Sequence, residues 1–219
     1  MNMGTIGIDT SNYTTSIAFF DGEGGENCSK LLPVKQGELG LRQSDAVFAH
    51  IKSLPELSGR LFSHIKGMQI TAVGVSTRPR AVEGSYMPCF LAGVSAATAF
   101  AQARGIPLIH TTHQQGHAAA ALFAAKGEEL FRQKVLLFHI SGGTTDLLLC
   151  NEVKEITTLG TSTDLYAGQA VDRVGVKLGF GFPAGVEVSR LAALCEEPIK
   201  PRSSVKGMQC SLSGLENQC

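Results

Sequence analysis

The chain has 219 residues, of which 43% are hydrophobic and 17% charged, a composition typical of a globular protein rather than a disordered one. Its 19 basic and 19 acidic side chains cancel, so no overall positive field indicates nucleic acid binding. Any RNA would have to be held by a partner or by a local patch. Lys200, Arg202 and Lys206 are the best local candidates, although such a run is equally typical of a solvated loop.

The first part of the chain alternates strand-like and helix-like segments, because apolar residues recur with period two and then with helical spacing. Pro55 marks a break or a new start within the longest helical pattern. In chain order, we expect strands at residues 4–9, 14–20 and 28–33, a helix at 43–65, a strand at 70–76, a helix at 90–104, a strand at 107–110 and a helix at 113–125.

The opening device of strand, polar turn and strand then recurs, with strands at 135–140 and 146–150 around the turn at 141–145. Residues 161–194 are expected to be largely helical. The repeat predicts an α/β fold of the actin-like ATPase superfamily, with two ribonuclease-H-like lobes of which the second is incomplete. The expected domains are 1–130, with the metal-site helix, and 131–219, with a glycine-turn nucleotide site and a helical insert.

Two turns carry residues suited to phosphate. Asp9 ends a predicted buried strand and is followed by small hydroxyl residues, which can hold a metal-bound water or a phosphate. The Ser-Gly-Gly-Thr-Thr turn at 141–145 offers hydroxyls and backbone N–H groups that a ligand can approach closely, because glycine lacks a Cβ atom. Either turn alone is equally typical of an ordinary turn, but the pair favours a nucleotide clamped between two lobes.

His113 and His117 lie four residues apart in a predicted helix, so they share one face and could bind one metal ion. Two histidines on a partly exposed face are the alternative. A zinc protease would need a Glu beside the first histidine as general base, whereas Gln114 cannot take up a proton at neutral pH. The pattern leaves metal binding open and argues against proteolysis.

Asp164, Gly168 and Asp172 follow one another at intervals of four, which predicts two carboxylates on one helical face with a glycine between them. A glycine inside a helix costs about 1 kcal/mol relative to Ala, so we expect another group to approach closely there. A carboxylate on this face suits the hydroxyl pair of a ribose. A solvent-facing Asp is the alternative.

Taken together, the motifs resemble the tRNA adenosine threonylcarbamoyltransferase family, formerly described as glycoproteases. The matching segments, in family order, are Gly-Ile-Asp-Thr-Ser at 7–11, His-x-x-x-His at 113–117, Ser-Gly-Gly-x-Thr at 141–145, Ala-Gly-Gln-Ala-Val-Asp at 167–172, the glycine-rich loop at 179–185 and Ser-Leu-Ser-Gly-Leu at 211–215. The resemblance implies transfer of threonylcarbamoyl from its adenylate to N6 of adenosine in tRNA. It also implies protein partners from the same pathway.

The resemblance assigns ligands to residues. His113 and His117 would bind one iron or zinc ion, which would polarise the threonylcarbamoyl group. Asp9 remains the candidate catalytic residue. ATP or the threonylcarbamoyl-adenylate, with Mg²⁺ as an option, would contact His139, Ile140, Ser141, Gly142, Gly143, Asp172 and Gly185.

The chain departs from the family pattern, which usually has acidic residues at Tyr13 and Thr14, Glu at Gln115 and His at Thr144. A further Asp ligand and an Asn contact belong to a C-terminal part that this sequence lacks. We therefore expect nucleotide binding, with weak or no transfer by the chain alone. A non-catalytic nucleotide-binding paralogue or scaffold is the main alternative, and a metallopeptidase or sugar kinase is a more distant one.

Six cysteines without C-x-x-C spacing indicate free thiols in a reducing cytoplasm. The chain does not open with a basic and then apolar segment, so no secretory signal is predicted. No apolar stretch is long enough to cross a bilayer, and no membrane partner is expected. The sequence leaves a dimer open.

Overall fold

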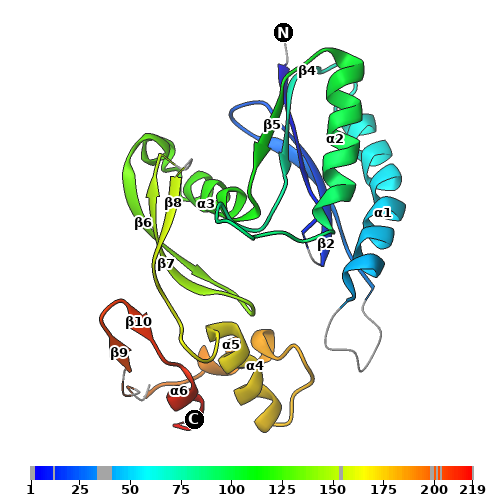
Figure 1. Cartoon of the computed structure of the whole chain (residues 1–219). Coiled ribbons are helices and arrows are strands. Elements are labelled where there is room, and N and C mark those ends of the chain that lie inside the picture. The colour runs from blue at the N-terminus through cyan, green and yellow to red at the C-terminus, as the bar shows by residue number, and fades with distance from the viewer. Residues whose placement is uncertain are drawn as a thin grey trace. The chain divides into compact units, whose positions relative to one another are not determined.

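The computed structural model describes residues 3–11, 13–33, 41–152, 155–197, 200, 202 and 204–218. The chain divides into two compact units, Met1–Ala124 and Ala125–Cys219, where the sequence predicted a boundary after residue 130. The two units are described in turn (Figure 1).

The first unit contains a five-stranded sheet in the order β3-β2-β1-β4-β5. Its strands are β1 (Met3–Asp9), β2 (Thr14–Phe20), β3 (Gly25–Leu31), β4 (Gln69–Ser76) and β5 (Leu108–Thr111). The first three form an antiparallel meander, whereas β4 joins β1 in parallel and β5 joins β4 in parallel. Ile6 and Ile8 of β1 enter the core because alternate strand residues face the same side of a sheet.

Helices α1 (Gln43–His64) and α2 (Phe90–Arg104) lie side by side on one face of this sheet (Figure 1). Leu54, Leu57 and Leu61 of α1 are buried in the core. The helix runs through Pro55, so the predicted break there is wrong. Burial of the leucine stripe offsets the backbone hydrogen bond that proline removes, because packing supplies most helix stability in proteins.

The second unit opens with a short 3-10 turn at Glu128–Arg132 and continues into a three-stranded antiparallel sheet. Its strands are β6 (Lys134–Ile140), β7 (Thr145–Asn151) and β8 (Glu155–Thr161). The predicted repeat is confirmed, since β1–β2 and β6–β7 are both antiparallel hairpins followed by a third antiparallel strand. The strand β8 was not predicted.

The remaining elements of this unit are the helices α4 (Ala167–Lys177), α5 (Gly185–Ala192) and α6 (Ser213–Glu216) and the hairpin of β9 (Val205–Lys206) and β10 (Gln209–Cys210). Because α4 begins at Ala167, Asp164 precedes the helix. The prediction that Asp164 and Asp172 share one helical face is therefore wrong. The predicted α/β class is confirmed by the two units together.

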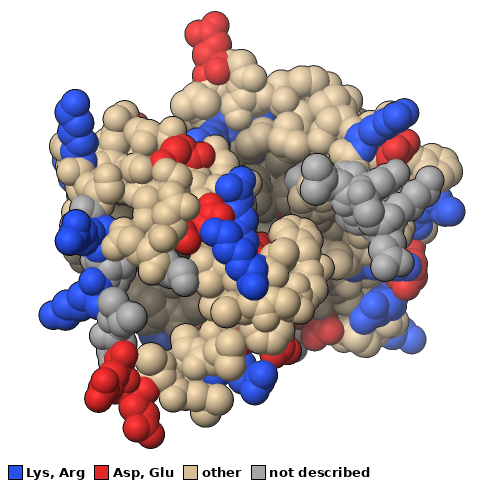
Figure 2. Space-filling model, turned by 90° about the horizontal axis from the view of Figure 1, so that it is seen from below, with Lys and Arg blue, Asp and Glu red and all other residues tan. Residues whose placement is uncertain are grey.

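The surface and the thiols agree with the composition. Basic and acidic side chains are interspersed on the face drawn in Figure 2. Lys200, Arg202 and Lys206 are exposed, and residues 201 and 203 between them lie outside the described range. The five described cysteines are free thiols, and Cys219 also lies outside that range. Across the described residues, no helix is long and apolar enough to cross a membrane.

Candidate functional sites

His113 and His117 bring two ring nitrogens together in helix α3 (His113–Ala124), which begins directly after β5. Their Nε2 atoms lie 2.9 Å apart. Zinc binds imidazole nitrogen at about 2.0–2.1 Å, so two such ligands at a tetrahedral angle stand about 3.3 Å apart. A small rotation of either ring would therefore admit one ion. The His117 side chain is exposed, which leaves the pair open to solvent or substrate.

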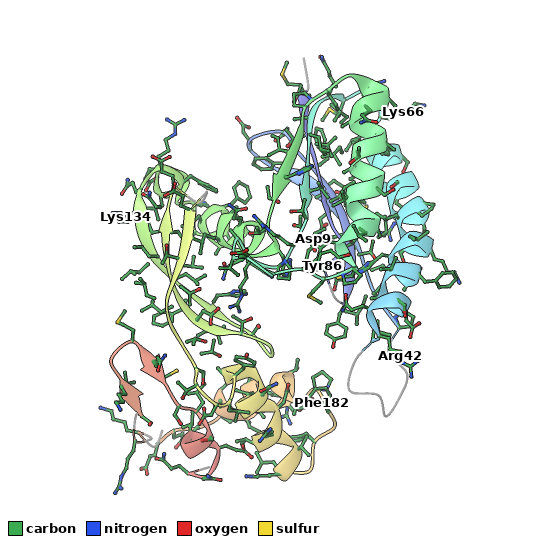
Figure 3. All side chains as sticks on the ribbon, in the orientation of Figure 1. Asp9, Arg42, Lys66, Tyr86, Lys134 and Phe182 are labelled. Atoms are coloured by element: carbon green, nitrogen blue, oxygen red, sulfur yellow. The ribbon has the colours of Figure 1, made fainter. Side chains whose placement is uncertain are left out.

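Asp9 orients the first of these histidines from the end of β1 (Figure 3). Its Oδ2 lies 3.0 Å from Nδ1 of His113, and because a carboxylate oxygen only accepts, this contact places a proton on Nδ1. Nε2, which faces His117, is then the nitrogen that could bind an ion. Burial alone would raise the pKa of Asp9, but hydrogen bonding and the charge of His113, with hydrogen bonds from Ser11 and Ser76, hold that pKa well below its usual range. Asp9 thus acts as a positioning residue for His113.

Gln115, which replaces a Glu of the family pattern, stabilises the start of α3. The N–H of Thr112 donates to Oε1 of Gln115 at 2.8 Å, and the N–H of Gln115 donates to Oγ1 of Thr112 at 3.2 Å. This reciprocal arrangement is a capping box, in which Gln serves as well as Glu. The replacement therefore keeps the first turn of α3, and with it His113, in place.

The histidine pair supplies two ligands. Among the described residues, the group of three donors close enough to share an ion lies elsewhere, at Glu26, Cys28 and His64. A tetrahedral ion at the histidine pair would therefore take its other ligands from water, substrate or chain outside the described range.

In the second unit, the turn between β6 and β7 packs against the start of α4. The N–H of Gly168 donates to the carbonyl of Ser141 at 3.1 Å, and the N–H of Ala167 donates to Oγ1 of Thr145 at 2.8 Å. A Cβ atom on Gly168 would lie 2.6 Å from the nitrogen of Gly142. The close approach predicted at Gly168 is confirmed, and the approaching group is the turn itself.

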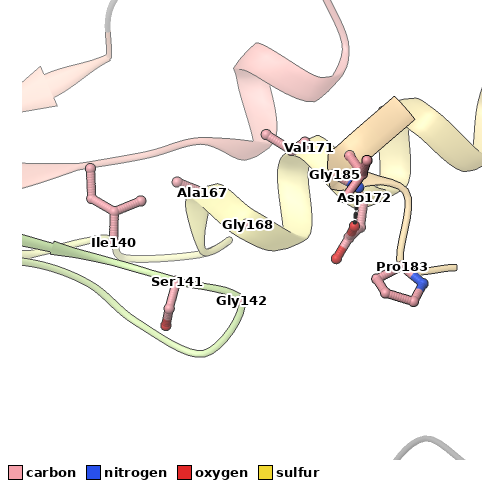
Figure 4. Close-up of a pocket in the computed structure, with 10 residues that line it drawn as sticks. Ile140, Ser141, Gly142, Ala167, Gly168, Val171, Asp172, Pro183 and Gly185 are labelled. Atoms are coloured by element: carbon pink, nitrogen blue, oxygen red, sulfur yellow. Dashed lines mark hydrogen bonds between the residues drawn. The ribbon is translucent and has the colours of Figure 1, made fainter. Parts of the chain in front are cut away.

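A pocket of ≈ 360 Å³ opens beside this contact (Figure 4), and we call it the turn pocket. Its volume falls in the range of about 300–1,000 Å³ that is usual for small-molecule sites. The N-terminal residues of α4 and α5 both contribute to it, and the first N–H groups of these helices donate to Thr145, Ser141 and Asp172. The lining residues are Ile140, Ser141, Gly142, Ala167, Gly168, Val171, Asp172, Pro183, Gly185 and Val186. None of them is Lys or Arg.

Asp172 is the charged group of the turn pocket. Its Oδ1 accepts the N–H groups of Ala184 at 2.8 Å and Gly185 at 3.2 Å, which caps the start of α5 (Figure 4). Oδ2 makes no hydrogen bond within the described chain, so it can accept one from a ligand. The geometry therefore suits a hydroxyl-bearing ligand, with Asp172 already fixed in place.

Of the seven residues predicted to bind nucleotide, the structure gathers Ile140, Ser141, Gly142, Asp172 and Gly185 in the turn pocket. His139 and Gly143 are not among the lining residues. His139 is adjacent to Ile140 in β6, so its side chain points to the opposite face of the sheet. The sequence did not reveal the apolar lining of Val171, Pro183 and Val186, because isolated aliphatic residues carry no chemical signature.

Asp164 has a different task from the one predicted. It accepts hydrogen bonds from the hydroxyl groups of Ser211 and Ser213 and from the N–H of Leu212 at 2.8 Å. These bonds hold the pKa of Asp164 well below its usual range. Asp164 thus anchors the segment 211–213, which leads into α6.

The fold and these two sites describe an α/β protein with a paired-histidine site in one unit and a nucleotide-sized pocket in the other. A sequence profile of the family described as tRNA N6-adenosine threonylcarbamoyltransferase matches residues 37–219. The chain belongs to that family, which confirms the resemblance seen in the motifs.

Individual relatives carry the same name. One from Campylobacter concisus is 32% identical over an alignment that covers 97% of this chain and 63% of the relative. One from Streptococcus pneumoniae strain CGSP14 is 36% identical over 151 residues, which cover 68% of this chain and 42% of the relative. The chain thus spans less than two thirds of the length of these relatives.

Solved structures are matched more distantly. YeaZ from Pseudomonas aeruginosa aligns with a TM-score of 0.46 and 13% identity, over 72% of this chain and 65% of that one. The ethanolamine utilization protein EutJ from Carboxydothermus hydrogenoformans aligns with a TM-score of 0.46 and 16% identity, over 86% and 60%. The fold assignment rests on the strand order of the chain itself.

Proposed function

We propose that the chain binds an adenylate in the turn pocket and one iron or zinc ion at the histidine pair, and that it takes part in the transfer of threonylcarbamoyl to N6 of adenosine in tRNA. The turn pocket is the observation that carries the proposal, because it combines a glycine turn, the hydroxyl of Ser141 and a fixed carboxylate. The names of the relatives support the reaction class.

Different residues of the turn pocket suit different parts of an adenylate. Ile140, Val171 and Pro183 offer apolar surface to a base and a sugar ring. Asp172 can accept hydrogen bonds from ribose hydroxyls, which are donors. The hydroxyl of Ser141 and the glycine turn beside it would contact the phosphate. Without Lys or Arg in the lining, the pocket favours an adenylate with one phosphate over the more highly charged ATP.

In the proposed reaction, N6 of the tRNA adenosine attacks the carbamoyl carbon of the adenylate. A carbon–nitrogen bond forms, the bond from that carbon to the phosphate oxygen breaks, and AMP leaves while N6 loses a proton. A bound metal would supply Lewis acidity. His113 and His117 would hold it, and Asp9 would keep His113 in the tautomer whose Nε2 faces the ion.

The test is incorporation of labelled threonine into tRNA, with the adenylate-forming enzyme and its substrates supplied. The assay uses the 219-residue chain and a chimera that adds the part of the Campylobacter relative beyond the alignment. Incorporation that depends on His113 would support the proposal. The His110→Ala variant is the matched control, because His110 is an exposed histidine on β5.

The non-catalytic paralogue is the second candidate. It is favoured by the departures at Tyr13, Thr14 and Thr144, which the capping role of Gln115 does not explain. This candidate requires adenylate binding by the chain together with no incorporation by either the chain or the chimera. That pair of results would replace transfer with a binding or scaffolding role.

A further inference from the structure

Strand β3 and helix α1 bring together three side chains that can bind a metal, and none of them belongs to the histidine pair. The ligand atoms of Glu26, Cys28 and His64 all lie within 4.8 Å of one another. Nδ1 of His64 is already 2.9 Å from Oε1 of Glu26. We propose that these three residues form a second metal site, selective for a borderline transition-metal ion such as zinc.

The register of α1 along β3 places these three side chains close together. Glu26, Cys28 and Lys30 share one face of the strand, because alternate residues do. Lys30 pairs with Glu56 of α1 at 2.6 Å, as Glu26 pairs with His64. The step of four residues from Glu26 to Lys30 spans about 13 Å along the strand, and the step of eight residues from Glu56 to His64 spans about 12 Å along the helix. The strand and the helix therefore run antiparallel with nearly equal spacing between the paired residues, and Cys28 lies between the two ion pairs.

The two ends of this contact differ in chemistry. Lys30 and Glu56 form an ordinary exposed ion pair, since an ammonium group cannot ligate a metal. At the other end, the basic partner is His64, which can ligate a metal, and the thiol of Cys28 lies beneath the pair of His64 and Glu26. Cys28 is only 1% exposed, whereas the side chains of His64 and Glu26 are 54% and 44% exposed. A cation would thus bind between a buried sulfur and two ligands that face solvent.

The donor set decides which ion fits. Thiolate, imidazole and carboxylate are the ligands of zinc, at about 2.3 Å from sulfur and 2.0–2.2 Å from nitrogen or oxygen. Calcium and magnesium prefer sites made of oxygen alone. Ligands of a tetrahedral ion stand about 3.3–3.6 Å apart, so the more distant of the three donors must approach by at most about 1 Å, whereas Nδ1 of His64 and Oε1 of Glu26, 2.9 Å apart, must separate slightly. Glu26 and His64 can supply this movement, because both side chains end in solvent.

Cobalt(II) titration of the full chain tests the proposal, because cobalt bound to a thiolate gives a near-ultraviolet charge-transfer absorption that histidine ligands alone do not give. We expect this absorption in the natural chain and in the His113→Ala/His117→Ala double variant. It should be lost in Cys28→Ser. His64→Ala, a change at the surface, should weaken cobalt binding at least tenfold and keeps the test valid if Cys28→Ser fails to fold.

Two matched controls separate this site from an accidental one. Glu26→Gln should weaken cobalt binding, whereas Glu56→Gln, at the other ion pair of the same contact, should leave it unchanged. Cys195→Ser removes an exposed thiol of the second unit and should also leave the absorption unchanged. An absorption that survives His64→Ala at full affinity, or that disappears in Cys195→Ser, would overturn the proposal, as would no thiolate absorption in the natural chain.

Discussion

The hydrogen bond between His113 and Asp9 gives the two residues separate tasks, which substitution can distinguish. His113→Ala and His117→Ala each remove a ligand, and the double variant should retain no metal at this pair. Asp9→Asn keeps both ligands but loses the carboxylate that fixes the tautomer, so we expect metal affinity to fall about 10- to 100-fold. Metal content after anaerobic dialysis measures both effects, with a Cys28→Ser background to remove the second proposed site.

His110→Ala is the control for these measurements, because it removes a histidine that belongs to neither proposed site. If the Cys28→Ser variant, in which His113 and His117 are intact, retains no iron or zinc, the histidine pair is a structural feature. Equal affinity in Asp9→Asn and the natural chain would remove the positioning role of Asp9.

Gly168 sets two glycine effects against each other. Replacing a helical glycine by alanine normally stabilises the folded state by up to about 1 kcal/mol. At Gly168 the new Cβ would lie 2.6 Å from the backbone of Gly142, and overpacking of this kind costs about 1–3 kcal/mol. We therefore expect Gly168→Ala to lower the free energy of unfolding.

Gly59→Ala is the matched change, because Gly59 lies inside α1 and a Cβ atom added there would meet nothing within 4 Å. It should raise the free energy of unfolding in the same denaturation experiment. If both Gly168→Ala and Gly59→Ala raise the free energy of unfolding, the turn tolerates the methyl group. The inference of a tight contact between the turn and α4 would then be wrong.

At the scale of elements, Asp164 makes the segment before α6 sensitive to acid. Hydrogen bonds from Ser211, Ser213 and Leu212 lower its pKa, so the folded chain holds the charged form more strongly than the unfolded chain does. This stabilisation is complete above the unfolded pKa of about 3.9 and is lost as the pH falls toward the lowered folded value. Amide exchange should therefore show constant protection of residues 211–216 from pH 7 to about 4, and a loss below.

Asp164→Asn should remove this anchor at neutral pH. One carboxylate oxygen is replaced by an amide nitrogen, which cannot accept the hydrogen bonds that the serine hydroxyls and the N–H of Leu212 donate. Asp45→Asn, an exposed position in the first turn of α1, is the control and should leave the exchange of residues 211–216 unchanged. Unchanged protection in Asp164→Asn would mean that other contacts hold the segment.

Elements with regular apolar spacing could be predicted from the sequence, and irregular ones could not. The strand β2 was predicted with its observed bounds, and so was the helix α2. The strand β8 was missed because the bulge opposite Leu147 and Leu148 shifts its register, leaving its partly buried residues Ile156 and Leu159 three positions apart. A period of two is then absent from the sequence, although every residue of the strand except Leu159 is paired with β7.

The residues of the candidate sites could likewise be predicted where they follow a local sequence pattern, and not where they are brought together by the fold. His113 and His117 were predictable because four residues make one helical turn, and the glycine turn because its composition is unusual. The pairing of Asp9 with His113 joins residues 104 positions apart, which no local pattern reveals. Asp164 was misassigned because its spacing to Asp172 is helical, while the helix starts only at Ala167.

On the scale of the whole molecule, family membership and the two compact units belong together. The profile match runs from residue 37 to 219 and so includes the histidine pair of the first unit and the turn pocket of the second. The chain covers 63% of the Campylobacter relative, so ligand binding by its own residues can be tested separately from transfer. Adenylate binding is therefore the property that the 219 residues can be tested for directly.

Calorimetric titration of AMP and ATP into three forms of the full chain measures adenylate binding. Gly142 lines the turn pocket and Gly143 does not, while a Cβ atom at either position meets nothing within 4 Å, so valine should leave both variants folded. We predict that the natural chain and Gly143→Val bind AMP more tightly than ATP, and that Gly142→Val binds neither. Equal binding by all three forms, or no binding by the natural chain, would contradict the account.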